Sequence, residues 1–465
     1  MNRHRGITLA GLCVAIALFV LYTNWPVVAS QQGIVPSGFA IVVPVLLGIA
    51  VVHQLVIARR PLVIDRTLLT MLAFLVVLLL STFTAEGYEE ALGRITAFLT
   101  EGVVIYFLVR NAVRSVPELR TAIIALLCAA GLLAALTTVQ AITGDYEQTF
   151  TGLAQRNLER VGQVSLADNE ELWMEDRARG PVDEPNRFAQ ILLLVAPLGV
   201  VTALNSRRRV GSTAAWLCVG ILLVGVLLTY SRGALVSLIV LLFLAVPLNL
   251  VRPARLVGAL TIGALVAVLA IPGFTERVGS MAGVAGLFGH AQVEPDGPTK
   301  GRTTEMLAAL AAYADHPILG VGPGQYVPFH SVHYQALPEV GIREIPIPRR
   351  AHNLYLEIAA ESGTVGLIIF MLIPTMLLLD LGVLRRALRR QRPDIARLAA
   401  GFSLAILAYL GTGMFLHLAF ERYYWALIAL TAAASGIFEE LVWEDEADQY
   451  ETINRSYSTF GGVTC

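Results

Sequence analysis

Runs of apolar residues long enough to cross a membrane recur along the whole chain. A transmembrane helix needs about 20 predominantly apolar residues, and the hydropathy pattern predicts about twelve such spans. They cover residues 7–24, 35–58, 66–84, 95–112, 121–142, 188–205, 212–230, 233–250, 255–272, 355–384, 396–417 and 423–439. The seventh and eighth divide one apolar stretch that is too long for a single crossing and is interrupted at Ser231-Arg232-Gly233. The predicted fold is therefore an all-α polytopic membrane protein.

The basic residues between the spans predict the orientation of the chain. Short cytoplasmic loops carry an excess of Lys and Arg, and arginines here fall on alternate loops. These are Arg3 and Arg5, Arg59 and Arg60, Arg110 and Arg114, Arg207 to Arg209, Arg252 and Arg255, and the run from Arg385 to Arg397. Both termini are thus predicted to be cytoplasmic, and a retained first helix is favoured over a cleaved signal peptide.

Four regions follow from this pattern. Residues 1–272 hold the first nine spans, with an external loop at about 143–187, and residues 354–439 hold the last three. Between them, residues 273–353 form an external loop domain, much longer than an ordinary connection. The acidic tail at 440–465 is predicted to be cytoplasmic, and its acidic stretch, 439–448, to be disordered.

The loop domain is predicted to contain one amphipathic helix. Thr303 or Thr304 is the expected N-cap, and Asp315-His316-Pro317 is expected to end the helix. Its apolar face is predicted to carry Met306, Leu307, Leu310 and Tyr313.

Composition agrees with a membrane protein. The chain is 56% hydrophobic and only 15% charged, with a net charge of −1, so it gives no indication of nucleic-acid binding. Cys13, Cys128 and Cys218 lie in apolar runs and Cys465 is the last residue, which argues against a disulfide or a thiolate metal site.

Three groups of polar residues lie on the predicted external side. Arg232 occupies the turn between the seventh and eighth spans, where an arginine can also simply extend to water. Arg302 directly precedes the predicted amphipathic helix. Gly320, Gly322 and Gly324 follow that helix and allow close approach of the backbone to a ligand or to another helix.

The third group runs from Arg349 into the tenth span. His352 and Asn353 precede the span, and Asn353, Glu357 and Glu361 share one helix face. The two carboxylates need partners near a bilayer, so they are expected to face protein or water. One interpretation makes them hydrogen-bond partners that hold His352 and the nearby arginines.

Taken together, these motifs resemble the O-antigen ligase and polymerase superfamily. The resemblance rests on Arg179-Gly180 with Glu184 to Ala189, on Ser231-Arg232-Gly233, on Arg302 through Gly324, and on His352-Asn353 with Glu361-Ser362-Gly363. Members usually carry an aromatic residue in the helix after the signature arginine, where this chain has Glu305-Met306. This departure leaves the acceptor contacts open.

The resemblance implies a GT-C-like glycosyltransferase with its large periplasmic loop between the ninth and tenth spans. Such proteins transfer a glycan from undecaprenyl pyrophosphate to an acceptor hydroxyl at the outer side of the bacterial inner membrane. The acceptor is another glycan, a lipid A core sugar or a protein. Direct attack inverts the anomeric centre, and neither a metal nor another cofactor is expected.

Candidate residues follow from the donor chemistry. Arg232 and Arg302 are expected to bind the pyrophosphate. His352 is expected to act as the base, although it could instead position the acceptor or contact phosphate. The further candidates for substrate binding are Arg187, Arg349, Arg350, Asn353, Gly322 and Gly324, with Glu357 and Glu361 behind them. Arg349 and Arg350 are equally compatible with solvated rim charges.

Other interpretations stay open at this point. His330 and His333 have metal-compatible spacing but no evident third ligand. A transporter or flippase of lipid-linked sugars also suits twelve spans, but related halves and broken helices are not evident. A non-enzymatic scaffold would leave the Arg and His residues unexplained. Within the family, the ligase assignment is favoured slightly over a polymerase, which would use the same donor.

Overall fold

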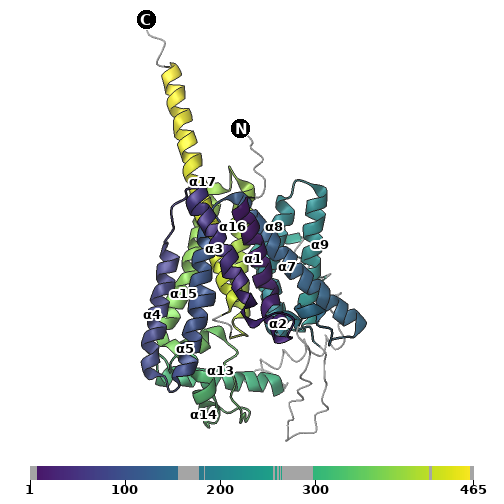
Figure 1. Cartoon of the computed structure of the whole chain (residues 1–465), viewed down its shortest axis with the longest axis vertical. Helices are drawn as coiled ribbons and strands as arrows, with labels where there is room; N and C mark the ends of the chain where they lie inside the picture. The colour runs from purple at the N-terminus through teal and green to yellow at the C-terminus, as the bar shows by residue number, and fades with distance from the viewer. Residues whose placement is uncertain are drawn as a thin grey trace.

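The computed structural model is a bundle of helices with a smaller helical layer across one end (Figure 1). It describes residues 8–154, 177–182, 184–254, four positions between 257 and 263, 297–417 and 421–460. The bundle is built from α1 Leu9–Thr23, α2 Trp25–Gln31, α3 Val42–Val52, α4 Arg66–Ser81, α5 Tyr88–Ala97, α6 Ile105–Ala112, α7 Val116–Thr143, α8 Pro185–Asn205, α9 Arg209–Leu228, α10 Arg232–Ala245, α15 Leu354–Leu388, α16 Pro393–Thr412 and α17 Arg422–Phe460. The end layer contains α13 Gly297–Asp315 and α14 Ser331–Gln335.

The helices confirm an all-α polytopic membrane protein. Nine helical segments of the described chain are long and apolar enough to cross a membrane, and α1 with α2, bent by 47°, would make a tenth. Helix α10 occupies the eighth predicted span but has only 14 residues. The ninth predicted span, 255–272, lies almost entirely outside the described residues.

The two ends of the bundle differ in what they carry. Figure 1 places the start of α1 and the end of α17 at one end, which we call the terminal end, and α13 and α14 at the other, which we call the α13 end. Loop arginines at the terminal end pair with the acidic part of α17, as in Arg392–Asp445 at 2.6 Å and Arg60–Glu440 at 3.5 Å. The prediction of disorder for residues 439–448 is therefore wrong, because α17 continues without a break through them.

Helix α13 lies across the end of the bundle and differs from its prediction in two respects. It begins at Gly297, so the prediction of Thr303 or Thr304 as N-cap is wrong, and Arg302 lies inside the helix. Both threonine hydroxyls instead donate to carbonyls one turn earlier, at 2.9 and 3.1 Å. The helix ends at Asp315, as predicted.

The buried face of α13 also differs from the predicted one. Leu310 is 46% exposed, whereas the buried face is formed by small and polar residues: Thr304, Glu305, Ala308, Ala309 and Ala312. Small side chains let α13 approach the start of α15 closely. This close approach brings Arg302 and Glu305 to the bundle.

A break in α15 receives the glycine-rich loop that follows α13. The backbone is non-helical at Gly363, where φ is +65° and ψ is −168°. Val321 N and Gly322 N donate to the carbonyls of Ala360 and Glu361 at 2.8 and 3.1 Å, and Thr364 N donates to Pro317 O at 2.8 Å. The loop thus satisfies the backbone groups that the break leaves without helical partners.

We expect Gly363→Ala to destabilise the protein by about 3 kcal/mol, because this backbone conformation is essentially restricted to glycine. An added Cβ would also overlap the carbonyl of Ile318. Thermal unfolding in detergent measures the effect. Gly382→Ala on the same helix is the control, because its added methyl meets nothing within 4 Å. Equal stability of the two variants would contradict the role given to the break.

Candidate functional site

The Ser231-Arg232-Gly233 motif forms the start of α10 at the α13 end. Ser231 is the N-cap, and its hydroxyl accepts from Ala234 N at 3.3 Å. Arg232 is the first residue of the helix. Gly233 packs against Phe415, and an added Cβ would come within 2.8 Å of that side chain. The motif therefore places one arginine at a helix N-terminus, an environment that favours anions.

The Arg179-Gly180 motif and the start of α8 lie beside this turn. Glu184 caps α8 by accepting from Asn186 N at 3.0 Å and Arg187 N at 2.5 Å. Pro185 occupies the first helical position, where proline is favoured. Gly180 adopts a φ of +57° and packs against the ring of Phe188. The residues of this motif thus fix the conformation of the backbone where α8 begins.

Arg177 joins these two helix ends and was not among the residues predicted from the sequence. Its Nε donates to Thr229 O at 2.8 Å, and a terminal guanidinium nitrogen donates to Asn186 Oδ1 at 3.2 Å. Burial lowers the pKa of Arg177 to about 10; positive charges nearby act in the same direction, while Glu184 opposes them. Those charges belong to Arg302, Arg179 and Arg232.

These four arginines, Arg177, Arg179, Arg232 and Arg302, form what we call the arginine cluster. They come from the segment before α8, from α10 and from α13. A partly buried arginine whose charge is disfavoured by other arginines gains from a bound anion. The cluster is therefore electrostatically suited to a phosphate group, and the two helix N-termini add to this preference.

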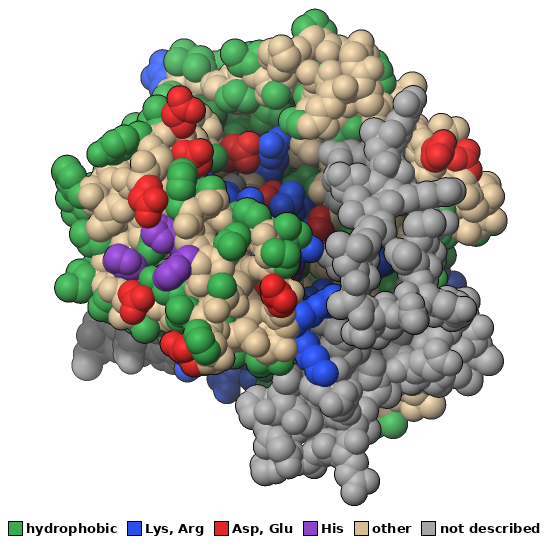
Figure 2. All heavy atoms as spheres, turned by 90° about the horizontal axis from the view of Figure 1, so that it is seen from below, with side chains coloured by type: hydrophobic (Ala, Val, Ile, Leu, Met, Phe, Trp, Pro, Cys, Tyr) green, Lys and Arg blue, Asp and Glu red, His purple; other side chains and the backbone are tan. Residues whose placement is uncertain are grey.

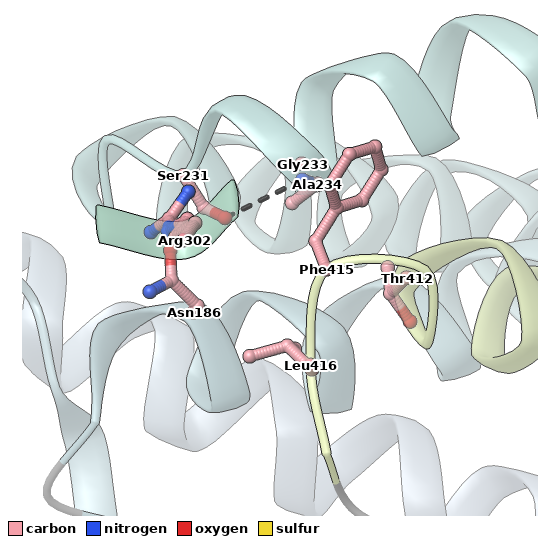
Figure 3. Close-up of a pocket in the computed structure, with 8 residues that line it drawn as sticks. All are labelled: Asn186, Ser231, Gly233, Ala234, Arg302, Thr412, Phe415 and Leu416. Atoms are coloured by element: carbon pink, nitrogen blue, oxygen red, sulfur yellow. Dashed lines mark hydrogen bonds between the residues drawn. The ribbon is translucent and has the colours of Figure 1, made fainter. Parts of the chain in front are cut away.

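A pocket lies at the cluster and is shown in Figure 3. Arg302 reaches it from α13 and lies between Ser231 and Asn186, while the segment after α16 closes the opposite side. The lining residues are Asn186, Ser231, Gly233, Ala234, Arg302, Thr412, Phe415 and Leu416. Seen from the α13 end, Figure 2 shows basic and acidic side chains gathered in a hollow of this face.

His352 lies immediately before α15 and contacts α13. Its Nδ1 is 2.8 Å from Glu305 Oε2 and 3.2 Å from the carbonyl oxygen of Arg350. The residue adopts a left-handed φ of +46°, which is uncommon for a side chain other than glycine. The structure thus holds the imidazole at a defined place. Part of this support comes from Glu305, where the sequence departs from the family pattern.

His417 connects His352 to the pocket. The rings of His352 and His417 are 5.2 Å apart and pack edge to face, and the preceding residue, Leu416, lines the pocket. Burial lowers the pKa of His417 well below its usual value, so this second imidazole is neutral near pH 7. Among the described residues its Nδ1 has no hydrogen-bond partner. This residue, too, was not among those predicted from the sequence.

The remaining candidates near His352 support the backbone. Asn353 is the N-cap of α15, accepting from Tyr355 N and Leu356 N at 3.0 Å, and it donates to Met414 O at 3.2 Å. Glu357 is buried, accepts from Arg350 at 3.3 Å and from Ala351 N at 3.4 Å, and so shapes the segment that carries His352. This arrangement fits the interpretation of Glu357 as a supporting carboxylate.

Four further candidates lie around this centre. Gly322 and Gly324 have φ of +106° and +73°, and they approach Ala85 and Arg94, so their close contacts are with the bundle. Glu361 is buried beside Arg94 and the backbone amides of Gly324 and Tyr326. Arg187 pairs with Glu421 at 3.4 Å.

Two sets of residues lie away from the pocket. The backbone of Arg349 donates to Ser331 at 3.3 Å. His330 lies 3.6 Å from Glu86 and packs near His316, with ring centres 6.3 Å apart. Within the described ranges, no three His, Cys, Asp or Glu side chains lie together as a metal site would require.

The fold and the site together define a class: a polytopic membrane protein with a basic pocket at one end of its bundle. Residues 217–371 match the family model described as O-antigen ligase. This match runs from α9 into α15 and contains Arg232, Arg302 and His352, so the chain is similar to this family over about a third of its length. The resemblance to the O-antigen ligase and polymerase superfamily is thereby confirmed. No curated protein matches the chain.

Proposed function

We propose that the protein is a glycosyltransferase that transfers a glycan from undecaprenyl pyrophosphate to an acceptor hydroxyl. The observation that carries this proposal is the meeting of the arginine cluster with His352 across α13. Arg302 lines the pocket, and Glu305, three residues later on the same helix, contacts His352 at 2.8 Å. Residues three apart are neighbours on a helix surface.

The donor has three chemically distinct parts, and the site offers an environment for each. The arginine cluster suits the pyrophosphate, because guanidinium groups form strong charge-assisted hydrogen bonds with phosphate oxygens. Exposed apolar residues of α9 and α10, such as Leu217 and Phe243 at 68% and 56% exposed, face lipid that would surround the polyprenyl chain. The hollow at the α13 end leaves the glycan accessible to water (Figure 2).

In the proposed reaction, the acceptor oxygen attacks the anomeric carbon as the bond from that carbon to the pyrophosphate oxygen breaks. The electron pair leaves with undecaprenyl pyrophosphate, and the arginine cluster stabilises the charge that develops there. His352 removes the proton of the acceptor hydroxyl. One displacement inverts the anomeric centre, and the arginines supply the positive charge without a metal ion.

The proposed setting is the bacterial inner membrane, with both termini in the cytoplasm and the α13 end in the periplasm. It is supported by the loop arginines at the terminal end of the bundle, in accord with the positive-inside rule. The proposed acceptor is another glycan, a lipid A core sugar or a protein, and we favour a ligase.

Transfer with purified protein in lipid tests this proposal. The protein is supplied with a defined polyprenyl-pyrophosphate glycan and separate candidate acceptors, and the products are weighed by mass spectrometry. A single glycan on a different acceptor is expected for a ligase, whereas a ladder of repeats on the lipid carrier indicates a polymerase. Unchanged donor with every acceptor would contradict the proposed function.

A further inference from the structure

Glu305 is a buried carboxylate in the middle of α13. Its side chain is 7% exposed, and Oε2 lies 2.8 Å from His352 Nδ1. A carboxylate removed from water needs a charged or hydrogen-bonding partner to offset lost hydration. Among the described residues, His352 makes the polar contact with this carboxylate. Tyr326 donates instead to the Glu305 backbone carbonyl, at 3.3 Å.

The neighbours of His352 determine which of its nitrogens carries the proton. Nδ1 faces both the Glu305 carboxylate at 2.8 Å and the carbonyl oxygen of Arg350 at 3.2 Å. A carbonyl oxygen only accepts hydrogen bonds, and so does an ionised carboxylate. Nδ1 must therefore be the donor. In the neutral imidazole, Nε2 is then the unprotonated nitrogen.

The ring is held on another side as well. His417 packs edge to face at 5.2 Å, and Asn353 fixes the adjoining backbone as the N-cap of α15. Rotating the imidazole to present Nδ1 to a substrate would break its contacts with both Glu305 and Arg350. The geometry thus favours one tautomer and one orientation.

We propose that Glu305 is the positioning residue for His352, holding Nε2 unprotonated and facing the acceptor and stabilising the imidazolium formed when the acceptor gives up its proton. This inference rests on the proposed function. The proton moves from the acceptor hydroxyl to Nε2 while the new carbon–oxygen bond forms and the pyrophosphate leaves. Nδ1 keeps its proton throughout, and Glu305 keeps its negative charge.

Glu305 lies on the same helix as Arg302. Arg302 and Glu305 lie three residues apart on this helix, so the contact with the leaving group and the orientation of the base depend on the same element. Small buried residues, Ala308, Ala309 and Ala312, pack this helix closely in place. The position of α13 against the bundle would therefore determine both the contact with the leaving group and the orientation of the base.

Glu305→Gln tests the proposal with little change in shape. The amide keeps the shape of the side chain beside Nδ1 but carries no charge, so we expect kcat to fall about 10-fold to 100-fold. The KM for the donor should change less than about twofold, because the arginine cluster is intact. Glu305→Ala should lose more, with partial recovery on adding formate. Glu344→Gln, an exposed carboxylate of the same loop domain, is the control.

A double variant separates positioning from general structural support. If Glu305 acts through His352, Glu305→Gln should lower the residual rate of His352→Gln by less than about threefold, since groups that act as a unit are not additive. An equal loss in both backgrounds would overturn the proposal, as would a wild-type rate in Glu305→Gln. Absence of transfer by the wild-type protein assayed in parallel would instead contradict the proposed function.

Discussion

Arg302→Ala should lower kcat/KM for glycan transfer by about 100-fold to 1,000-fold, because one preorganised group that stabilises developing charge contributes about this much. Arg302 reaches the pocket from α13 and lies among three other arginines. The substitution removes the guanidinium group that the loop domain brings to the bundle. Initial rates with a defined polyprenyl-pyrophosphate glycan give the measurement, and Arg302→Lys should retain part of the activity through its charge.

The control is Arg343→Ala in the same loop domain. The backbone amide of Arg343 donates a hydrogen bond to the Thr304 hydroxyl at 3.1 Å, and this bond does not depend on the Arg343 side chain. Thermal unfolding should show that both variants fold. Transfer by Arg302→Ala at a rate within tenfold of the wild type would contradict the assignment of Arg302 to the leaving group.

His352→Ala should lower kcat by about 100-fold to 10,000-fold, which is the range for loss of a general base. Binding of the donor should persist, because His352 contacts Glu305 and Arg350 and is not among the residues that line the pocket at the arginine cluster. Single-turnover rates separate the chemical step from binding. Retention of undecaprenyl pyrophosphate by the variant protein shows whether the arginine cluster still binds the pyrophosphate.

His333→Ala is the matched control, since His333 packs against Tyr334 on the loop domain, away from the pocket. It should transfer glycan at the wild-type rate. A His352→Ala variant that loses donor binding with kcat preserved would show that this imidazole contacts the phosphate, which was the other interpretation of the residue.

The helical architecture was predictable because transmembrane helices leave a strong local signal. Each needs a long apolar run, and the flanking arginines repeat at alternate loops. The acidic end of α17 was predicted wrongly because its charges indicate disorder only when isolated. In the structure Asp445 pairs with Arg392 from another loop, and the helix continues.

Helix α13 shows where the local signal ends. Its first turns contain Gly297, Pro298 and Gly301, which are typical of a loop, so the sequence pattern delays the start. Its leucines suggested a buried face, yet Leu310 is 46% exposed while Glu305 is buried. The choice of face depends on what α13 packs against, and the start of α15 lies about 40 residues further along the chain.

The candidate site was predictable only where its residues lie in local sequence motifs. Arg232, Arg302 and His352 stand in recognisable motifs, and the family match at residues 217–371 contains all three. Arg177 and His417 had no such signal, because each has a neighbour that is distant in sequence. Arg177 meets Thr229 and Asn186, and His417 meets His352 only after the segment following α16 folds back onto α15.

The fate of the anomeric carbon–oxygen bond of the donor tests the central claim most directly. Purified protein in lipid vesicles is given a polyprenyl-pyrophosphate glycan and an acceptor, and both lipid and glycan products are identified by mass spectrometry. Glycan transfer predicts free undecaprenyl pyrophosphate and glycosylated acceptor in equal amounts. Movement of intact donor between the leaflets without cleavage would contradict it and would indicate a transporter.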